Sequence, residues 1–209
     1  LCTQALLKGV GVGDSSANST SAVIQWILRD GLGLLGGLIF AYLCSKQFGT
    51  YVKQWRLFAD IINDVGLTLE LMSPMFPKYF VLIASAGSVC RAMCGIAAGA
   101  TRAAITLHFS KGVSNRASDI ATKENMQETL VTLIGLVVGG YVADRLGGSN
   151  RMIWAMFLVL TVFHVFANYM AVTALALQSV DLQRGLILSK EYIRTCLLYT
   201  SPSPRDKRQ

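Results

Sequence analysis

The sequence has little charge, little proline and little histidine. Charged residues make up 15% of the 209 positions, against about 25% in an average soluble domain. A soluble domain with so few charges would have difficulty covering its surface, whereas lipid can face apolar side chains directly. Four prolines and a mean hydropathy of +0.48 leave long stretches free to form apolar helices. The composition therefore favours a helical membrane protein.

The motifs of conventional enzymes are also missing. The sequence contains two histidines, no G-x-S-x-G, no Walker A motif and no His-rich metal signature. Cys90 and Cys94 are one helical turn apart, which is neither C-x-x-C nor zinc-finger spacing, and we interpret them as small packing residues. Gly31-x-Gly33-x-x-Gly36 matches the dinucleotide fingerprint in letters, but a helical pattern precedes it where that fold requires a strand. We expect no enzyme activity, no cofactor and no metal.

Four stretches are predicted to span a bilayer, which requires about 20 apolar residues. They are residues 31–46, 79–106, 129–147 and 152–178. The second contains Arg91 and Arg102. A central arginine costs about 2.5–3.5 kcal/mol and a leucine returns about 0.3–0.6 kcal/mol, so two arginines offset most of the apolar gain. This stretch should either be buried within a bundle or break into two pieces.

The stretch Tyr51 to Met72 is amphipathic when it is drawn as a helix. Its apolar side carries Phe58, Ile61, Ile62, Val65, Leu69 and Met72, and its polar side carries Lys53, Arg56, Asp60, Asn63 and Asp64. Ser73-Pro74 and Pro77 mark its end. The helix is predicted either to lie in the membrane interface or to line a polar cavity.

Small residues recur at four-residue spacing, which in membrane helices allows two backbones to approach closely. The pairs are Gly9 and Gly13, Gly33 and Gly37, Gly95 and Gly99, and Gly135 and Gly139. We expect them to mediate helix packing, including contacts with a protein partner or a second copy of the chain. The connection from Ser110 to Gln127 is rich in charge and is predicted to be an aqueous loop.

Eight polar residues within or beside the predicted spans form a candidate functional cluster. They are Arg56, Asp60, Asn63, Asp64, Arg91, Arg102, His164 and Asn168. The two aspartates share a helix face, which would bind a cation or relay protons in a membrane cavity, or form an ordinary wet face with i,i+4 ion pairs on an interfacial helix. The two arginines also share a face, and they would pair with these aspartates or bind an anion or lipid headgroup.

A second pair within this cluster, His164 and Asn168, is expected to be buried and mutually hydrogen-bonded, with a proton relay as the alternative. A net charge of +7 suits loops at an anionic membrane surface. It does not indicate nucleic acid, because no basic cluster is interleaved with aromatic residues.

The two ends of the chain look unlike a complete protein. The sequence starts at Leu1 within a helical pattern, so we read it as truncated there. Residues 196–209 (CLLYTSPSPRDKRQ) resemble a translated sequencing adaptor, the alternative being a disordered basic tail. One domain is therefore expected over residues 1–195.

Several long blocks of this sequence closely resemble the root UVB sensitive family. They are TQALLKGVGVG (3–13), KQWRLFADIIND (53–64), GATRAAITLHF (99–109), QETLVTLIGL (127–136) and HVFANYMAVTAL (164–175). The resemblance implies a eukaryotic domain long classed as of unknown function, with plant relatives associated with UV-B responses and early seedling development, some in plastids. Animal relatives are described as membrane proteins. The resemblance supplies no catalytic residue, and the family's C-terminal region is missing here.

Together these patterns predict an all-α, multi-pass membrane bundle with one amphipathic helix. The sequence does not specify which membrane holds it, and an organellar membrane is one candidate. A membrane-anchored scaffold or regulatory protein is the favoured function. Transport of a small solute or ion through the bundle is the alternative.

Overall fold

The computed structural model describes residues 2–9, 19–111, 113–145, 149–175 and 182–195. Within these ranges the regular elements are all helices, which confirms the predicted all-α class. The chain divides into two compact units, Leu1–Ala176 and Leu177–Gln209. The second unit contains one described helix, α7 (Leu182–Thr195).

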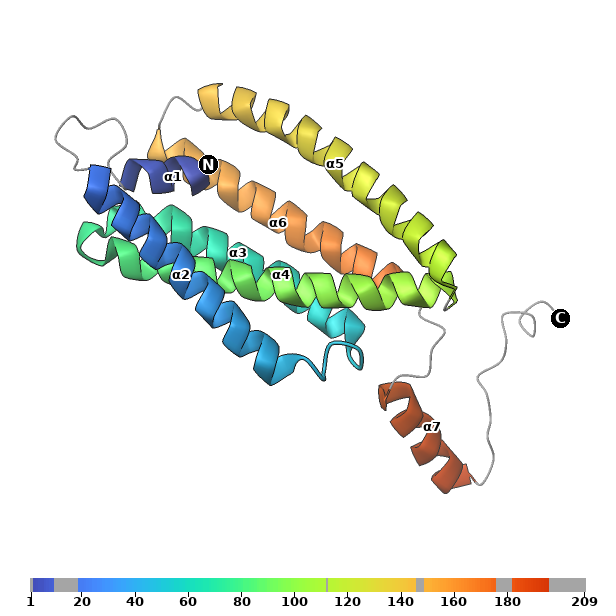
Figure 1. Cartoon of the computed structure of the whole chain (residues 1–209). Coiled ribbons are helices and arrows are strands. Elements are labelled where there is room, and N and C mark those ends of the chain that lie inside the picture. The colour runs from blue at the N-terminus through green and yellow to red at the C-terminus, as the bar shows by residue number, and fades with distance from the viewer. Residues whose placement is uncertain (1, 10–18, 112, 146–148, 176–181, 196–209) are drawn as a thin grey trace. The chain divides into compact units, whose positions relative to one another are not determined.

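The first unit is a bundle built around two long helices that lie side by side. These are α3 (Val52–Met72) and α4 (Phe80–Ser110), joined by the short 3₁₀ helices η1 (Ser73–Met75) and η2 (Pro77–Tyr79). The remaining helices are α1 (Cys2–Gly9), α2 (Ser19–Cys44), α5 (Ser114–Arg145) and α6 (Asn150–Ala174). Helix α2 packs on α4, α1 and α6 pack on α3, and α5 contacts α4 (Figure 1).

The central pair packs closely because glycines meet where α3 and α4 face each other. A Cβ added at Gly66 would lie 3.0 Å from the carbonyl oxygen of Gly87, and one added at Gly87 would lie 2.9 Å from the carbonyl oxygen of Gly66. Larger residues at these positions would push the two backbones apart. The four-residue spacing rule did not identify this pair, because its members lie on different helices.

Helix α2 approaches α4 through a second set of glycines. Gly33 lies against Ser88, and a Cβ added at Gly37 would lie 3.1 Å from the Cβ of Ala92. This confirms the packing role predicted for Gly33 and Gly37.

Two other pairs do not pack against another helix within the described residues, and their predicted contact with a protein partner or a second copy stays a prediction. A Cβ added at Gly95, Gly99, Gly135 or Gly139 would meet nothing within 4 Å. The faces of α4 and α5 that carry these glycines are not covered by another described helix. Gly9 lies against Phe80, while its predicted partner Gly13 lies outside the described residues.

An aromatic cluster closes one end of the α2–α3–α4 packing. The ring centroids of Phe48 and Trp55 are 4.9 Å apart, and those of Trp55 and Phe58 are 5.2 Å apart, both edge to face. Phe40 of α2 stacks on Phe58 at 5.9 Å. These contacts bury Phe48 of the otherwise mostly exposed connection between α2 and α3, and they attach the start of the amphipathic helix to the bundle.

Among the described residues, four helices are long and apolar enough to cross a membrane: Ala22–Cys44, Pro77–Ser110, Ser114–Arg145 and Asn150–Ala174. These helices correspond to the four predicted spans, with corrected limits. The first begins well before residue 31, because Arg29 and Asp30 lie within α2 and do not end it. The second is a single unbroken helix despite Arg91 and Arg102, so of the two predicted outcomes the break into two pieces is wrong. The fourth ends at Ala174, and residues 176–178 of that prediction lie outside the described residues.

The predicted aqueous loop from Ser110 to Gln127 is wrong. Helix α4 ends at Lys111, whose left-handed backbone (φ 53°) turns the chain, and α5 then starts at Ser114. The high charge of this segment was read as a loop, but residues 114–127 contain no proline or glycine and include good helix formers. Charge alone indicates contact with water and does not exclude a helix.

The distribution of side chains is opposite to that of a soluble bundle. Large apolar side chains such as Leu38 and Leu136 are 69% exposed, whereas Glu70 is completely buried and Asp64 nearly so. The interpretation of Asp60 and Asp64 as a wet helix face is therefore wrong. Their side of α3 faces α4 and α6, while Ile61 and Val65 of the same helix are exposed.

Candidate functional site

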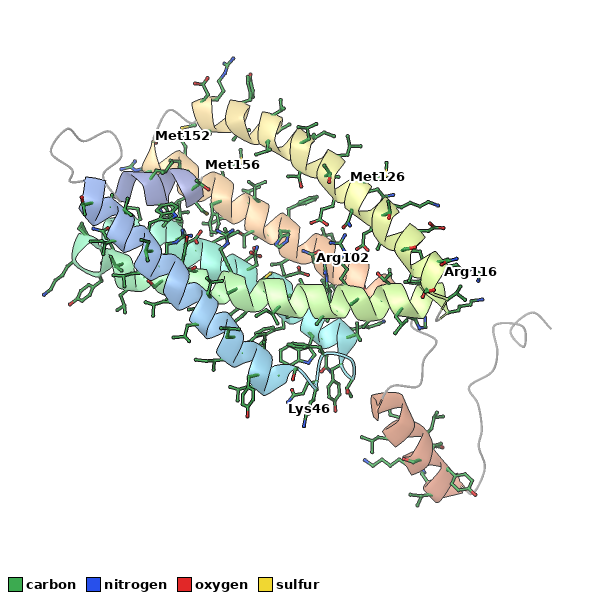
Figure 2. The ribbon with its side chains drawn as sticks, viewed as in Figure 1. Lys46, Arg102, Arg116, Met126, Met152 and Met156 are labelled. Carbon is green, nitrogen blue, oxygen red and sulfur yellow. The ribbon has the colours of Figure 1, made fainter. Side chains whose placement is uncertain are left out.

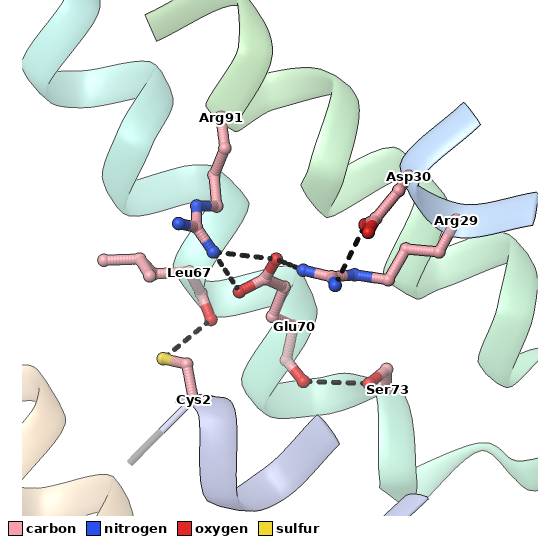
Figure 3. A network of polar contacts seen from close by, with 7 residues as sticks. All are labelled: Cys2, Arg29, Asp30, Leu67, Glu70, Ser73 and Arg91. Atoms are coloured by element: carbon pink, nitrogen blue, oxygen red, sulfur yellow. Dashed lines mark hydrogen bonds and ion pairs between the residues drawn. The ribbon is translucent and has the colours of Figure 1, made fainter. Parts of the chain in front are cut away.

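A network of charged side chains lies where α2, α3 and α4 meet (Figure 3). Glu70 of α3 accepts a hydrogen bond from Nη2 of Arg29 at 2.6 Å, and both its oxygens lie 3.3 Å from Nη1 of Arg91. Arg29 also bonds Oδ1 of Asp30 at 3.2 Å. These four residues, Arg29, Asp30, Glu70 and Arg91, are called the Glu70 cluster.

The helices hold Glu70 in place through local bonds at the end of α3. The hydroxyl of Ser73 donates to the carbonyl oxygen of Glu70 at 2.8 Å, and Ser73 is itself completely buried. A Cβ added at Gly87 would lie 2.9 Å from Cγ of Glu70, so the glycine leaves the space that this side chain occupies. At the same level α1 contacts α3, where Sγ of Cys2 donates to the carbonyl oxygen of Leu67 (Figure 3).

Arg29 is the most enclosed cation of the Glu70 cluster. Its guanidinium lies 5.0 Å from the ring centroid of Trp26, which adds a cation–π contact to its two ion pairs. Its Nε has no accessible surface and no hydrogen-bond partner among the described residues. A buried donor without a partner is rare and often marks a functional position.

A cavity of about 540 Å³ opens beside the Glu70 cluster, between α2 and α4. Its lining consists of Arg29, Asp30, Gly33, Leu34, Ser88, Arg91 and Ala92. Arg91 is 49% exposed, so its guanidinium both contacts Glu70 and faces solvent-accessible space. The cavity is large enough for a small organic molecule, and it presents two guanidinium groups and a serine hydroxyl.

A second group of polar side chains lies on a different side of α3. Nδ1 of His164, on α6, is 3.0 Å from Oδ2 of Asp64. Asp60, one turn earlier, interacts electrostatically with Arg56, His164 and Asp64, and the thiol of Cys94 on α4 interacts with both aspartates. The residues Arg56, Asp60, Asp64, Cys94 and His164 are called the Asp60 cluster.

Asp60 is nine-tenths buried, and its Oδ2 has no hydrogen-bond partner among the described residues. Burial raises the pKa of this carboxyl above its usual range. Arg56 and His164 oppose that rise, and Asp64 adds to it.

The predicted pairing of the arginines with Asp60 and Asp64 is wrong. Arg91 pairs with Glu70, while Arg102 bonds Glu124 at 2.9 Å and Glu128 at 2.7 Å, both on α5. Figure 2 labels Arg102 on α4. Arg102 also donates to Asn125 at 2.9 Å. It therefore anchors α5 to α4 at an exposed position and belongs to neither cluster.

The predicted hydrogen bond between His164 and Asn168 is also absent, because the imidazole of His164 bonds Asp64 on the neighbouring helix instead. Among the described residues Asn63 and Asn168 have no side-chain hydrogen bond, and both are half-buried. Of the eight predicted residues, the structure thus groups Arg56, Asp60, Asp64 and His164 together and leaves the others apart.

Arg29, Asp30 and Glu70 were not among the residues predicted from the sequence. A signal was present, because Glu70 interrupts the apolar stretch LTLELM and Arg29-Asp30 interrupts AVIQWILRDGLGLL. Ionisable residues inside apolar helices almost always face a bundle interior. No group of three or more metal-ligating side chains suited to a metal occurs among the described residues.

The fold and the two clusters define an all-helical domain with ionisable groups buried among helices of membrane-spanning length. The model of the family described as "Vitamin B6 photo-protection and homoeostasis domain" matches residues 1–196. The chain belongs to this family, the root UVB sensitive family, which confirms the predicted membership.

Two relatives illustrate the similarity. Protein root UVB sensitive 3 of Arabidopsis thaliana is 44% identical over 93% of this chain and 44% of its own length. RUS family member 1 of Dictyostelium discoideum is 37% identical over 99% of this chain and 40% of its own length. The chain spans less than half the length of the curated relatives it matches. No solved structure matches it.

A third relative carries a location in its name. Protein root UVB sensitive 2, chloroplastic, of Arabidopsis thaliana is 31% identical over 100% of this chain and 46% of its own length.

Proposed function

We propose that this domain is integral to a membrane and that its helical bundle holds a small anionic solute in the cavity beside the Glu70 cluster. The observation that carries the proposal is the completely buried Glu70, held between two arginines that line an open cavity. In a chain that exposes many leucine, isoleucine, valine and phenylalanine side chains, such a group serves a purpose other than solubility.

The membrane part of the proposal is supported by helix length and by side-chain distribution. Helix α6, with 25 residues, is about 37 Å long and exceeds the hydrocarbon thickness of about 30 Å. Its exposed side chains include Val162, Phe163 and Phe166, which lipid would cover.

This part is tested by alkaline carbonate extraction of membranes containing the intact protein, in which we expect it to stay in the pellet. Release into the supernatant would contradict integration. The experiment starts with organellar membranes, because one relative is named chloroplastic.

The charge of the cavity favours an anion. The charged residues that line it are Arg29, Asp30 and Arg91, which sum to one positive charge, and Glu70, which pairs with both arginines, is not part of the lining. Arg91 lines the cavity and makes its ion pair with Glu70 through Nη1, so its Nη2 and Nε take no part in that pair. Arginine donors of this kind bind phosphate and carboxylate groups in two-point contacts.

The family description names vitamin B6, whose coenzyme form is a phosphate ester. A phosphorylated B6 vitamer fits the cavity in charge and in approximate size. We propose this class of solute for the cavity, and we propose no catalytic step within the domain. Binding, sequestration or passage of the solute through the bundle are all compatible with the same site.

The test uses the intact protein in lipid nanodiscs with pyridoxine 5′-phosphate and pyridoxine as probes. These probes lack the aldehyde that would react with surface lysines. We expect the phosphate ester to bind at least tenfold more tightly than pyridoxine. Arg91→Gln should weaken the phosphate ester roughly ten- to hundredfold, which corresponds to the loss of a charge-assisted bond of about 1.5–3 kcal/mol.

Arg102→Gln is the matched control, because it removes the same charge from the same helix outside the cavity. It should leave affinity within about twofold. Equal binding of both probes, or equal effects of the two variants, would contradict the anion site. Competition by inorganic phosphate alone would show that the site recognises phosphate without the pyridine ring.

A membrane-anchored scaffold is the second candidate, and a different observation favours it. The apolar half of α5 is exposed throughout, and Gly135 and Gly139 would accept a Cβ without any contact. Such a face suits a neighbouring helix from a protein partner or a second copy. If this candidate is correct, Gly135→Leu will abolish reproducible co-purification of membrane neighbours, while Arg91→Gln will leave it unchanged.

A further inference from the structure

The Asp60 cluster lies apart from the proposed solute cavity, on a different side of α3. At 100° per residue Asp64 and Glu70 are about 120° apart around that helix. Glu70 faces α2 and α4, whereas Asp64 contacts His164 of α6. The residues that line the cavity do not include any member of the Asp60 cluster.

The first observation is the incomplete hydrogen bonding of Asp60. Its Oδ2 has no accessible surface and no hydrogen-bond partner among the described residues, although the side chain is nine-tenths buried. An ionised carboxylate oxygen in this state would carry a large desolvation penalty. A proton on this carboxyl removes the charge and with it most of that penalty.

The second observation is the charge of the whole cluster. Arg56 and Asp60 are one turn apart on α3 without an ion pair shorter than 4 Å between them, and Asp64 adds a second negative charge. Cys94 on α4 interacts electrostatically with both aspartates, and His164 on α6 contacts Asp64. With both aspartates ionised, Arg56 charged and the other two groups neutral, the cluster carries one negative charge. A single proton makes it neutral.

The third observation is the contact that links the aspartates to α6. With neutral His164, the imidazole donates from Nδ1 to Oδ2 of Asp64. Asp64 therefore has a partner while Asp60 does not, so the extra proton belongs on Asp60. A second proton, on His164, would turn the same contact into an ion pair.

We propose that Asp60, Asp64 and His164 form a proton-binding site between α3 and α6, with Asp60 holding the exchangeable proton. This proton site shares with the proposed function only the assumption that the domain lies in a bilayer. It does not require that the cavity beside the Glu70 cluster binds a solute. Helix α3 carries this site on one side and Glu70 on another. If the proton site and the solute site are both present, proton uptake and solute binding involve side chains of the same helix, α3.

The primary experiment is infrared difference spectroscopy of the intact protein in nanodiscs over a pH titration. A protonated carboxylic acid has a C=O stretching band well separated from the carboxylate bands. We expect such a band to persist at pH values where an exposed aspartate has lost its proton, above about pH 5. Absence of this band from the folded wild-type protein would overturn the proposal without any variant.

Asp60→Asn assigns the band, and Asp30→Asn is the matched control because Asp30 is half exposed and bonded to Arg29. The band should disappear in the first variant and remain in the second. Its survival in Asp60→Asn, or its loss when Na⁺ is added at constant pH, would overturn the proposal, the latter because it would identify a metal-cation site.

Histidine NMR supplies an independent measurement in the same nanodiscs. The present sequence has two histidines, and His164→Gln assigns the relevant signal. Asp64→Asn should change the imidazole chemical shifts of His164 while leaving those of His108 unchanged, because the Asp64 carboxylate contacts the His164 ring. Unchanged His164 shifts would refute the contact between α3 and α6.

Failure of this site is distinguishable from failure of the solute site. A normal protonated-acid band with no binding of pyridoxine 5′-phosphate supports the proton site and refutes the anion proposal. Binding of pyridoxine 5′-phosphate without a protonated-acid band supports the anion proposal and refutes the proton site.

Discussion

Replacement of Glu70 by glutamine is the sharpest test of the buried ion pairs. The change keeps the shape of the side chain and removes its charge. Arg29 would then remain buried with one partner fewer, while its Nε already lacks a partner among the described residues. The other guanidinium, on Arg91, is half exposed, so water can replace its bond to Glu70.

The expected magnitude follows from this difference in burial. Removal of one member of a buried ion pair destabilises proteins by about 3–5 kcal/mol, because the other charge is left uncompensated. Asp30 and Trp26 still contact Arg29, so we expect the lower end, about 3 kcal/mol. Loss of the exposed bond to Arg91 should add less than about 1 kcal/mol.

The assay is reversible unfolding in mixed micelles by SDS titration, with Glu70→Gln, Arg91→Gln and the double replacement Arg29→Met/Glu70→Met compared with the wild type. We expect Arg91→Gln to cost under about 1 kcal/mol. The double replacement should be more stable than Glu70→Gln, because it removes both buried charges together. If Glu70→Gln costs no more than Arg91→Gln, the argument from burial is refuted.

Three further predictions concern the packing and charge of the bundle. Gly66→Val should lower the unfolding free energy by about 1–3 kcal/mol, because the valine side chain would strike the backbone of α4. Gly95→Ala should raise it by up to about 1 kcal/mol, since a Cβ there meets nothing. The same SDS titration measures both variants, and equal effects would contradict the packing of α3 on α4. Asp60→Asn should become progressively more stable than the wild type as pH rises: burial raises the folded-state pKa of Asp60, so the contribution of its bound proton is complete below the ordinary aspartate pKa of about 3.9 and is lost as pH rises through the raised value. A pH-independent difference in unfolding free energy would contradict that shift. Arg102→Gln should cost under about 1 kcal/mol, because its ion pairs with α5 are solvent-exposed, and a loss similar to that of Glu70→Gln would show that those pairs are desolvated.

The sequence predicted helix α3 correctly but not the start of helix α5. Helix α3 was predicted with nearly its observed limits, because periodicity and the prolines after Ser73 are local features. Its orientation was left open between an interfacial and a cavity-lining helix, and the structure places the aspartates inside the bundle. The start of α5 was predicted as a loop, because charge was treated as evidence against helix.

The candidate site was recovered in part. Asp60, Asp64 and His164 were predicted as polar residues within or beside the spans, and the structure groups them. Asp64 and His164 are in contact although they are 100 residues apart in the sequence. Glu70 was overlooked because it is the single charge in the stretch LTLELM and belongs to no visible motif, although it lies two turns after Asn63 and therefore on the same side of the helix.

The sequence by itself determined that the chain forms helices, that several of them are apolar over a membrane-spanning length, and which family it belongs to. These properties are local, because a helix satisfies its backbone hydrogen bonds within its own segment and each stretch of residues carries its own hydropathy. Only the tertiary structure decided which charges meet. Arg91 pairs with Glu70 and Asp64 with His164, because partner choice depends on which faces the helices present after Gly66 and Gly87 bring α3 and α4 together. That close approach cannot be read from either helix alone.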